Sequence, residues 1–500
     1  MYICLTSYTL YGLEAVPVSV EVSITPGLPR FEIIGLPDAS IRECRERIFQ
    51  SIKKYGYEIP PGCITVNLAP AEIRKKGALF DLPIAVGILL SSAQVQQNGH
   101  NFSNMLIAGE LSLNGDVKKV NGVFNAGYTC IKKSLMLFML PASNVNEIKY
   151  FKKLKIIPVT NLKEAVDYFE HSRIISNNGN NRMKKSSTQQ VQNRDFDFSQ
   201  IYGNEFAKKA IELALVARMN ILLIGPPGCG KSMLIQRIPT ICSKLTDQES
   251  IEVSRIYSAG GLLKQKIIEY PPFRQVHNTI TPHALFGGGH SPLPGEISLS
   301  HNGVLFLDEL SEFQRSVIQM LRQPMEDKKI VINRMNFTYS FPCNFILAAA
   351  TNPCACGYYG DTNRICMCSP NTIARFYSRL SGPILDRIEL ILYISPPDDN
   401  IIFTDRNKSS EQMKKEMKGP LSFLKANSYY LSNRNIHKIM NSNQGIKRII
   451  KDAYTKGFIS LRRVKAIMKA ALALALFDNK AVGEEQVYEA IQYCKFKWSI

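Results

Sequence analysis

The 500-residue sequence contains no apolar run of the roughly 18–20 residues that a membrane-spanning helix needs. The nearest candidate, residues 78–90, is interrupted by Asp81 and Pro83. The first twenty residues also lack the basic segment followed by an apolar stretch that is typical of a secretory signal peptide. We therefore expect a soluble cytoplasmic protein with no membrane partner.

Acidic residues are also few. The chain has 42 Asp and Glu against 61 Lys and Arg, which gives a formal net charge of +19. This surplus suits a polyanionic partner such as DNA, although charge alone does not identify one. Apolar residues make up 45% of the chain and charged residues 21%, which excludes a wholly disordered protein. In a long chain without an export signal, the 12 cysteines predict reduced thiols or metal ligands rather than disulfides.

The order of patterns along the chain predicts three structured parts and one linker. Residues 1–172 alternate short β-rich and helical segments, as in a mixed α/β domain. Residues 173–200 are polar and aperiodic, which is typical of a flexible linker. Residues 201–397 alternate strand and helix signals, the pattern of a parallel sheet with crossover helices. Residues 398–500 begin with a basic, Asn-rich insertion and end in helical segments.

A glycine-rich motif directly follows the apolar strand predicted at residues 221–224. It fits G-x-x-x-x-G-K-[ST] and comprises Gly225, Pro226, Pro227, Gly228, Cys229, Gly230, Lys231 and Ser232. The glycines allow backbone N–H groups to converge on phosphate oxygens, Lys231 supplies a positive charge, and Ser232 offers a hydroxyl to Mg²⁺. The helix that contains Met233 points its positive end at the nucleotide. The motif predicts a site for ATP and Mg²⁺, with a chance glycine turn as the alternative.

Polar residues end two further predicted strands. Asp308 and Glu309 follow the apolar run at residues 303–307, where Asp308 can hold Mg²⁺ and Glu309 can polarise the attacking water. Asn352 follows the run at residues 345–350 and is suited to orient that water, although a turn-forming Asn is the alternative. Ligands of open parallel sheets bind at the carboxyl ends of the strands, so we expect these residues to meet in one crevice.

Four cysteines form a C-x-C…C-x-C pattern within residues 354–368. They are Cys354, Cys356, Cys366 and Cys368. Four thiolates so close in sequence can surround Zn²⁺ tetrahedrally, which predicts a zinc knuckle. Four reduced cysteines on a loop are the alternative, because C-x-C spacing is less common than C-x₂₋₄-C.

Residues 201–395 resemble an AAA+ ATPase, and more closely the magnesium-chelatase-like YifB/ComM family. The resemblance rests on GPPGCGKS, PGEISLSHNGVLFLDELSEF, LRQPMED, ATNPCACGYYGD and SRLSGPILDRIEL. It extends to PGLPRFEIIGLPDASIRECRERI and KKGALFDLPIAVGIL near the N-terminus, and so covers nearly the whole chain.

The resemblance implies an AAA+ P-loop domain with a C-terminal helical lid. By this resemblance, Arg387 is an arginine finger that acts on a neighbouring subunit, and Arg462 is the lid arginine of the Ser460-Leu-Arg462 motif. A surface ion pair is the alternative for each arginine. It also implies a hexameric, DNA-binding motor, a helicase that drives branch migration during natural transformation. Two alternatives stay open: a protein-remodelling or regulatory ATPase without a DNA substrate, and the ATPase subunit of a magnesium chelatase.

The N-terminal domain resembles the proteolytic domain of Lon, which has the ribosomal S5 domain 2-like α/β fold. A Ser–Lys dyad protease needs a nucleophilic hydroxyl and a lysine with a depressed pKa. Residues 76–81 carry no hydroxyl or thiol, and residues 121–126 carry no lysine. We therefore expect no active protease. In the lid, residues 471–476 read ALALAL where the family has a polar helix, which predicts an apolar lid surface.

Overall fold

The computed structural model describes residues 2–96, 102–171, 196–264, 267–289, 292–334, 337–361, 364–380, 382–396, 407–455 and 460–494. The predicted linker lies outside these ranges apart from residues 196–200. The chain folds into two compact units. The first comprises Met1–Lys185, Ser250–Ile268 and Ile332–Phe341, and the second comprises Ser186–Glu249, Glu269–Val331 and Pro342–Ile500.

A seven-stranded mixed sheet forms the centre of the first unit, in the order β3-β4-β2-β1-β5-β8-β9. Strands β1 and β2 are antiparallel, and Gly12 adopts a φ of +61° in the two-residue turn between them. The strands are β1 (Tyr2–Tyr11), β2 (Glu14–Thr25), β3 (Arg30–Ile34), β4 (Cys63–Ala69), β5 (Met105–Ile107), β8 (Leu137–Pro141) and β9 (Lys155–Val159), and a separate pair is formed by β6 (Glu110–Leu111) and β7 (Val117–Lys118).

Helix α3 lies within the core of this unit, because all of its residues are buried and it packs on β1 and β2. Its sequence is apolar on every face, which is the pattern expected of a helix enclosed on all sides. The helices of this unit are α1 (Ala39–Arg42), α2 (Cys44–Lys54), α3 (Asp81–Ser91), α4 (Val123–Lys132), α5 (Val145–Ile148) and α6 (Leu162–His171).

Two segments from the predicted 201–397 domain belong to this first unit. The first segment, Ser250–Ile268, contains most of helix α10 (Asp247–Ala259). It is joined to the rest of the unit by a hydrogen bond in which Gly122 N donates to Ser258 O over 3.1 Å. The second segment lies in the hairpin of β15 (Lys329–Arg334) and β16 (Phe337–Pro342), where the rings of Tyr339 and Tyr11 lie 4.8 Å apart. The sequence motifs give no sign of either association.

The second unit is built on a five-stranded parallel sheet in the order β11-β14-β17-β10-β18. The central strands are continuous apolar runs and fully buried, as expected for a parallel sheet covered on both faces. The strands are β10 (Ile221–Ile224), β11 (Phe273–Val276), β14 (Val304–Leu307), β17 (Ile346–Thr351) and β18 (Leu390–Tyr393), and β12 (Gly287–Gly288) pairs with β13 (Leu293–Pro294) beside them.

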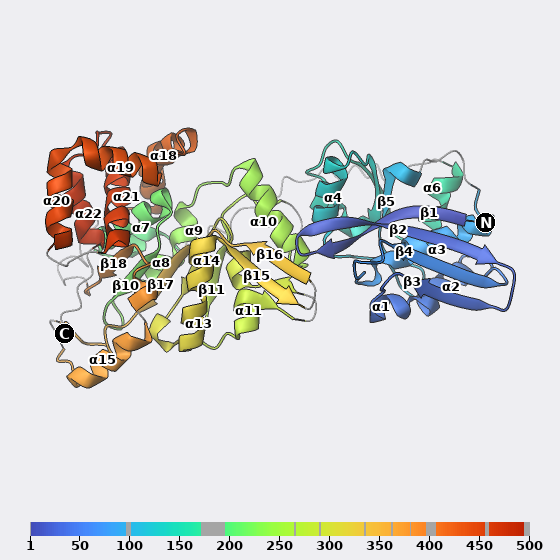
Figure 1. Ribbon diagram of the computed structural model, residues 1–500, viewed down its shortest axis with the longest axis horizontal. Helices are drawn as coiled ribbons and strands as arrows, with labels where there is room; N and C mark the ends of the chain where they lie inside the picture. Colours follow the sequence, from blue (N-terminus) through green and yellow to red (C-terminus); the bar gives the residue numbers. More distant parts are fainter. Residues whose placement is uncertain are drawn as a thin grey trace. The chain divides into compact units, whose positions relative to one another are not determined.

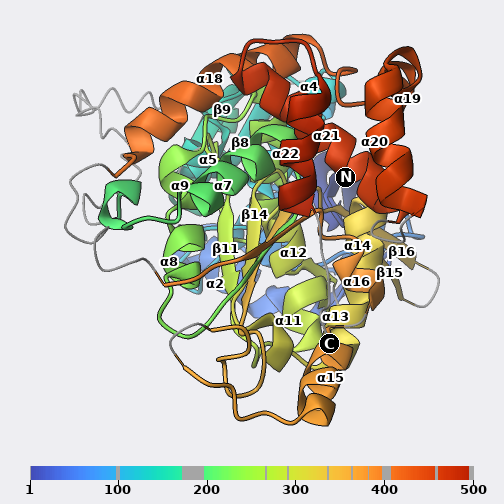
Figure 2. The same ribbon diagram turned by 90° about the vertical axis from the view of Figure 1, so that its left-hand side faces the viewer.

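Helices complete the second unit. The five C-terminal helices described, from residue 410 to residue 494, form the lid; they are coloured orange to red and lie next to α7 (Figures 1 and 2). This lid shares one hydrophobic core with the sheet. The helices are α7 (Glu205–Ala217), α8 (Lys231–Gln236), α9 (Ile238–Ile241), α11 (Pro282–Phe286), α12 (Glu296–Leu299), α13 (Arg315–Met320), α14 (Arg322–Asp327), α15 (Pro370–Arg379), α16 (Gly382–Leu385), α18 (Ser410–Ala426), α19 (Asn433–Ser442), α20 (Gln444–Thr455), α21 (Leu461–Phe477) and α22 (Glu484–Cys494).

The α/β fold class predicted from the sequence is confirmed in both units, including the helical C-terminus. Among the described residues, no helix is long and apolar enough to cross a membrane.

Candidate nucleotide-binding site

The glycine-rich loop connects β10 to α8, and its backbone requires glycine at several positions. Gly228 and Gly230 adopt φ values of +83° and +88°, a region that favours glycine. A Cβ at Gly225 would lie 2.2 Å from Ile394 O and 2.9 Å from Cys229 Sγ, so a side chain does not fit there. The loop passes closely over the end of β18, with Pro226 and Pro227 following Gly225 in its tight turn.

Lys231 places its ammonium group inside this loop. Its Nζ donates to Gly225 O over 2.7 Å and to Pro226 O over 2.8 Å. Burial lowers the pKa of Lys231, while Cys229, Asp308 and Glu309 act in the opposite direction. A buried cation held by neutral carbonyls is electrostatically suited to an anionic ligand such as a phosphate.

Ser232 and Asp308 lie side by side although 76 residues separate them in sequence. Ser232 Oγ donates to Asp308 Oδ1 over 3.0 Å, because β17 alone separates β10 from β14 in the sheet. A hydroxyl and a carboxylate at the carboxyl ends of these strands offer the hard oxygen ligands that Mg²⁺ prefers. This donor set fits Mg²⁺ bound together with nucleotide phosphates.

Glu309 follows Asp308 in a left-handed backbone conformation with a φ of +52°. Non-glycine residues rarely adopt this conformation, which concentrates at functional sites. The Glu309 N–H donates to Asp308 Oδ1 over 3.1 Å, and the residue is exposed. The backbone thus turns directly after β14, and Glu309 is exposed to solvent at this turn.

Asn352 joins the same cluster from the end of β17. Its Oδ1 lies 3.3 Å from Lys231 Nζ. The structure therefore brings Lys231, at the start of α8, together with Asp308 after β14 and Asn352 after β17. Met233 lies on α8 directly after Ser232 and is largely exposed.

Arg387 and Arg462 also meet, at a carboxylate outside this cluster. Arg387 Nη2 lies 2.7 Å and Arg462 Nη2 lies 2.5 Å from Glu326 Oε1. These two contacts with cations lower the pKa of Glu326. Ser460, which caps α21, donates to Asp386 Oδ1 over 2.7 Å and holds the start of the lid helix beside Arg387.

Two residues of this network were not identified from the sequence. Glu326 lies in the LRQPMED motif, and that motif was the only available signal for it. Arg463, next to the predicted Arg462, is buried and donates to the carbonyl oxygens of Leu385, Glu389 and Cys494. Burial lowers the pKa of Arg463. Of the two adjacent arginines, Arg463 fastens the lid, and Arg462 extends to the surface.

The four cysteines predicted to bind zinc converge after β17. The sulfur atoms of Cys354, Cys356, Cys366 and Cys368 all lie within 4.8 Å of one another. Cys354 is buried, and the other three are partly buried.

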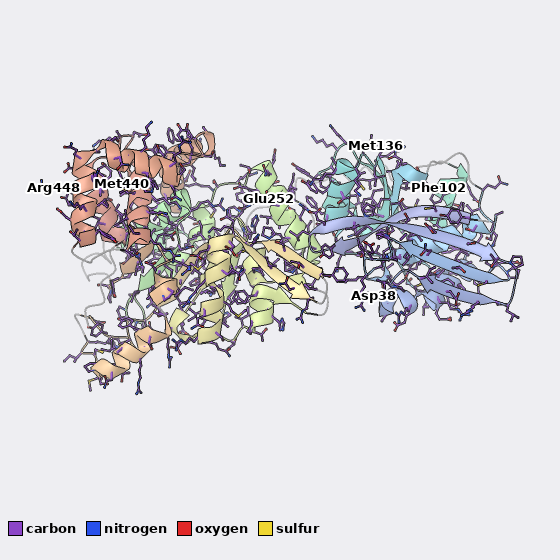
Figure 3. The ribbon with its side chains drawn as sticks, viewed as in Figure 1. Asp38, Phe102, Met136, Glu252, Met440 and Arg448 are labelled. Atoms are coloured by element: carbon purple, nitrogen blue, oxygen red, sulfur yellow. The ribbon has the colours of Figure 1, made fainter. Side chains whose placement is uncertain are left out.

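In the first unit, residues 76–81, where Lon would carry its serine, are held by hydrogen bonds and an ion pair. Asp38, labelled in Figure 3, caps α1 and accepts from Ile41 N over 3.0 Å and Gly77 N over 2.9 Å. Asp81 is buried and pairs with Arg47 over 2.7 Å. Burial raises the pKa of Asp81 to about 6, and the hydrogen bond and charge of Arg47 oppose this rise.

Lys75 is buried near the same loop and donates to Pro70 O, and burial lowers its pKa. In the other segment expected to carry a dyad residue, Asn125 Nδ2 donates to Leu13 O over 2.8 Å. In or next to each segment, a side chain therefore donates a hydrogen bond to a backbone carbonyl of the first unit.

A cavity of about 520 Å³ lies elsewhere in the second unit and is mainly apolar. Leu421 and Leu424 of α18 line it, together with Lys469 of α21. Burial and the nearby cations Lys328 and Arg218 lower the pKa of Lys469. The cavity lining includes none of the glycine-rich loop, so it is separate from the predicted nucleotide site.

Comparisons with known families and proteins agree with this architecture. Residues 197–400 match the family model described as magnesium chelatase, subunit ChlI, and residues 20–144 match the model described as subunit ChlI of Mg-chelatase.

Three curated relatives show how far the similarity extends. The protein YifB of Salmonella typhimurium is 32% identical over 493 residues, which cover 96% of this chain and 95% of YifB. The competence protein ComM of Haemophilus influenzae is 33% identical over 494 residues, which cover 96% of this chain and 93% of ComM. Lon protease 2 of Bacillus subtilis is 26% identical over 148 residues, which cover 28% of this chain and 27% of that protease.

Proposed function

Because this chain belongs to the YifB/ComM family of magnesium-chelatase-like AAA+ proteins, we propose that it is a Mg²⁺-dependent ATPase that acts on DNA as a ring-shaped motor. The observation that supports this most is the convergence of Lys231, Ser232, Asp308 and Asn352 at adjacent strand ends. This arrangement provides the parts that phosphoryl transfer from ATP to water requires.

Each residue of the cluster has a distinct role in the proposed reaction. The loop from Gly225 to Ser232 binds the phosphates through its backbone N–H groups, and Lys231 neutralises charge on the β- and γ-phosphates. Ser232 and Asp308 would hold Mg²⁺, which draws charge from the phosphate oxygens and orients them. Glu309 accepts a proton from the attacking water, and Asn352 orients that water.

Arg387 is proposed to act on the γ-phosphate bound by the neighbouring subunit, as an arginine finger does. Arg462 is proposed to contact nucleotide from the lid. Since both guanidinium groups pair with the partly exposed Glu326, a shift of the lid or of a neighbouring subunit can redistribute them between this carboxylate and a phosphate. Hydrolysis would then depend on assembly, and we propose a hexamer.

DNA is the proposed substrate, with branch migration during natural transformation as the process. Two observations support it: the net charge of +19 and the 33% identity to a protein named for competence. Exposed basic side chains on the lid contribute to this charge, including Arg448 on α20, which points outward in Figure 3. A motor working on DNA with ATP would operate in the cytoplasm.

The test uses a synthetic four-way junction with mobile arms, labelled on one strand. With ATP and Mg²⁺, the purified chain should convert it to duplex products. Glu309→Gln should abolish conversion, whereas the control Glu312→Gln, three residues further on, should retain it. Failure to move the junction by a chain that hydrolyses ATP would overturn the DNA-motor proposal. A protein-remodelling ATPase, or the ATPase subunit of a magnesium chelatase, would then be the better assignment.

A further inference from the structure

The cysteine cluster has the geometry of a tetrahedral metal site. The sulfur of Cys354 lies 3.3 Å from that of Cys356 and 3.7 Å from that of Cys366, and the last two are 3.5 Å apart. Four thiolates at a Zn–S distance of about 2.3 Å have sulfurs about 3.8 Å apart. All four cysteines are free, so no disulfide explains their proximity.

The chemistry of the cluster favours a single soft metal ion such as Zn²⁺ over hard cations and over clusters of several iron atoms. Four sulfur ligands in tetrahedral arrangement are typical of Zn²⁺ or iron–sulfur sites. An iron–sulfur cluster places iron and sulfide between the thiolates and so holds them further apart. Mg²⁺ and Ca²⁺ prefer oxygen ligands, and none of the four positions supplies one.

Backbone amides support the sulfurs from outside the cluster. The Tyr359 N–H donates to Cys354 Sγ over 3.3 Å, and the amides of Tyr358 and Met367 donate to Cys356. Donors of this kind stabilise thiolates and orient them toward a metal. Ile373 and Phe376 of α15 pack against the cluster, so it also anchors the helix that follows.

The same loop touches the nucleotide site in two ways. Asn352, whose side chain lies beside Lys231, comes only two residues before Cys354. The backbone of Gly357, between the two cysteine pairs, lies against Pro227 of the glycine-rich loop, because a Cβ there would be 2.8 Å from Pro227 Cδ. The segment that the cysteines fold therefore lies directly on the phosphate loop.

We propose that Cys354, Cys356, Cys366 and Cys368 bind one Zn²⁺ and that this zinc holds Asn352 and Pro227 in place for ATP hydrolysis. Binding converts the four thiols to thiolates, whose protons pass to solvent, with no oxidation or reduction. The zinc site stands on its own geometry, whereas its effect on hydrolysis rests on the proposed ATPase function.

The first test measures zinc in the purified full-length chain by mass spectrometry and exchanges it for Co²⁺. One zinc per chain, and the strong visible absorption of tetrahedral cobalt–thiolate, are expected. Cys356→Ser should reduce zinc below about 0.1 per chain. The control Cys4→Ser, at an exposed cysteine of β1, should retain it. A wild-type chain grown with added zinc that holds none, and shows no cobalt–thiolate absorption, would overturn the site.

The second test measures ATP hydrolysis after zinc is removed from the folded wild-type chain with a chelator, and the chelator is then removed and Mg²⁺ is resupplied. This design avoids dependence on a variant that fails to fold. A fall of about ten- to a hundredfold, restored by adding Zn²⁺, is expected, because small displacements of positioning groups have effects of this size. Unchanged hydrolysis by the zinc-free chain would overturn the coupling. A zinc-loaded chain that hydrolyses no ATP would instead overturn the ATPase proposal and leave the zinc site intact.

Discussion

Lys231 is a buried cation whose surroundings suit an anionic ligand. Its ammonium is buried, with its closest hydrogen bonds to the neutral carbonyls of Gly225 and Pro226. Burial lowers its pKa, which means that the protein environment disfavours the charge that the residue carries. A bound phosphate relieves this cost, so ATP binding and the protonated state of Lys231 reinforce each other.

Asp81 in the first unit gives a pH-dependent prediction. Burial raises its pKa from 3.8 to about 6, so between these values the unfolded chain loses the proton while the folded chain retains it. The folded state then binds more protons, and stability falls as pH rises through this window. Below pH 4 both states are protonated, and above pH 6 both are charged.

Asp81→Asn removes this titration. We expect the free energy of unfolding of the wild type, minus that of the variant, to fall by up to about 3 kcal/mol between pH 4 and pH 7. Urea unfolding followed by circular dichroism at several pH values measures it. A difference that is flat across this range, or that rises with pH, would show that Asp81 does not titrate as described.

At the candidate nucleotide site, the residues that the sequence predicts lie in local motifs. The spacing of the glycine-rich loop and the carboxylates after β14 follow from local chemistry, which a sequence displays directly. The sequence did not point to Glu326 because its contact with Arg462 joins residues 136 positions apart in sequence. Such long-range pairings exist only in the folded chain.

At the scale of elements, helix α21 differs from its sequence expectation. The run at residues 471–476 predicted an apolar lid surface, but residues 470–475 are all buried, and residues 470–474 belong to the core that the lid shares with the sheet. The sequence pattern is apolar on all faces, and periodicity alone does not distinguish an exposed apolar face from an enclosed helix. Helix α21 is enclosed because it packs against α22, α18 and α7.

Leu472→Ala tests this burial. Leu472 is 0% exposed, so truncation should lower the free energy of unfolding by about 2–5 kcal/mol through lost apolar burial and a cavity. Leu461→Ala on the same helix is the matched control, because Leu461 is 68% exposed and should change stability by only about 0.5 kcal/mol. Urea unfolding compares the two. Equal effects would contradict a buried α21.

The basic stretch after residue 398 also contains regular structure. Helices α18 and α19 lie within it, and Met413 and Met417 of α18 are buried in the core of the second unit. The Lys and Asn content obscured this pattern, since only one face of each helix is apolar. The composition of this stretch did not predict how its helices pack.

At the scale of the whole molecule, an arginine finger at Arg387 requires catalysis to be shared between subunits. Arg387→Ala and Glu309→Gln should each reduce ATP hydrolysis by about 10³-fold or more. When the two variants are mixed, some interfaces combine an intact Glu309 with an intact Arg387 from the neighbour. Random assortment gives about a quarter of such interfaces, so activity should return to roughly that share.

The mixture also distinguishes the alternatives. If Arg387 acts within its own chain, no subunit in the mixture has both residues, and hydrolysis stays at the level of the single variants. Mixing Glu309→Gln with Lys231→Ala provides the control, because every site in that mixture lacks either Glu309 or Lys231 and hydrolysis should stay low. Sedimentation of the mixture shows whether the two variants assemble into rings.

The most direct test of the central claim measures ATP hydrolysis by the purified chain with and without single-stranded, duplex and branched DNA, across a series of salt concentrations. The account predicts hydrolysis that requires Glu309 and is stimulated by DNA, with DNA binding that weakens steeply as salt rises. Hydrolysis that requires Glu309 but is unaffected by every DNA would contradict the DNA-motor account and leave an ATPase with a different substrate.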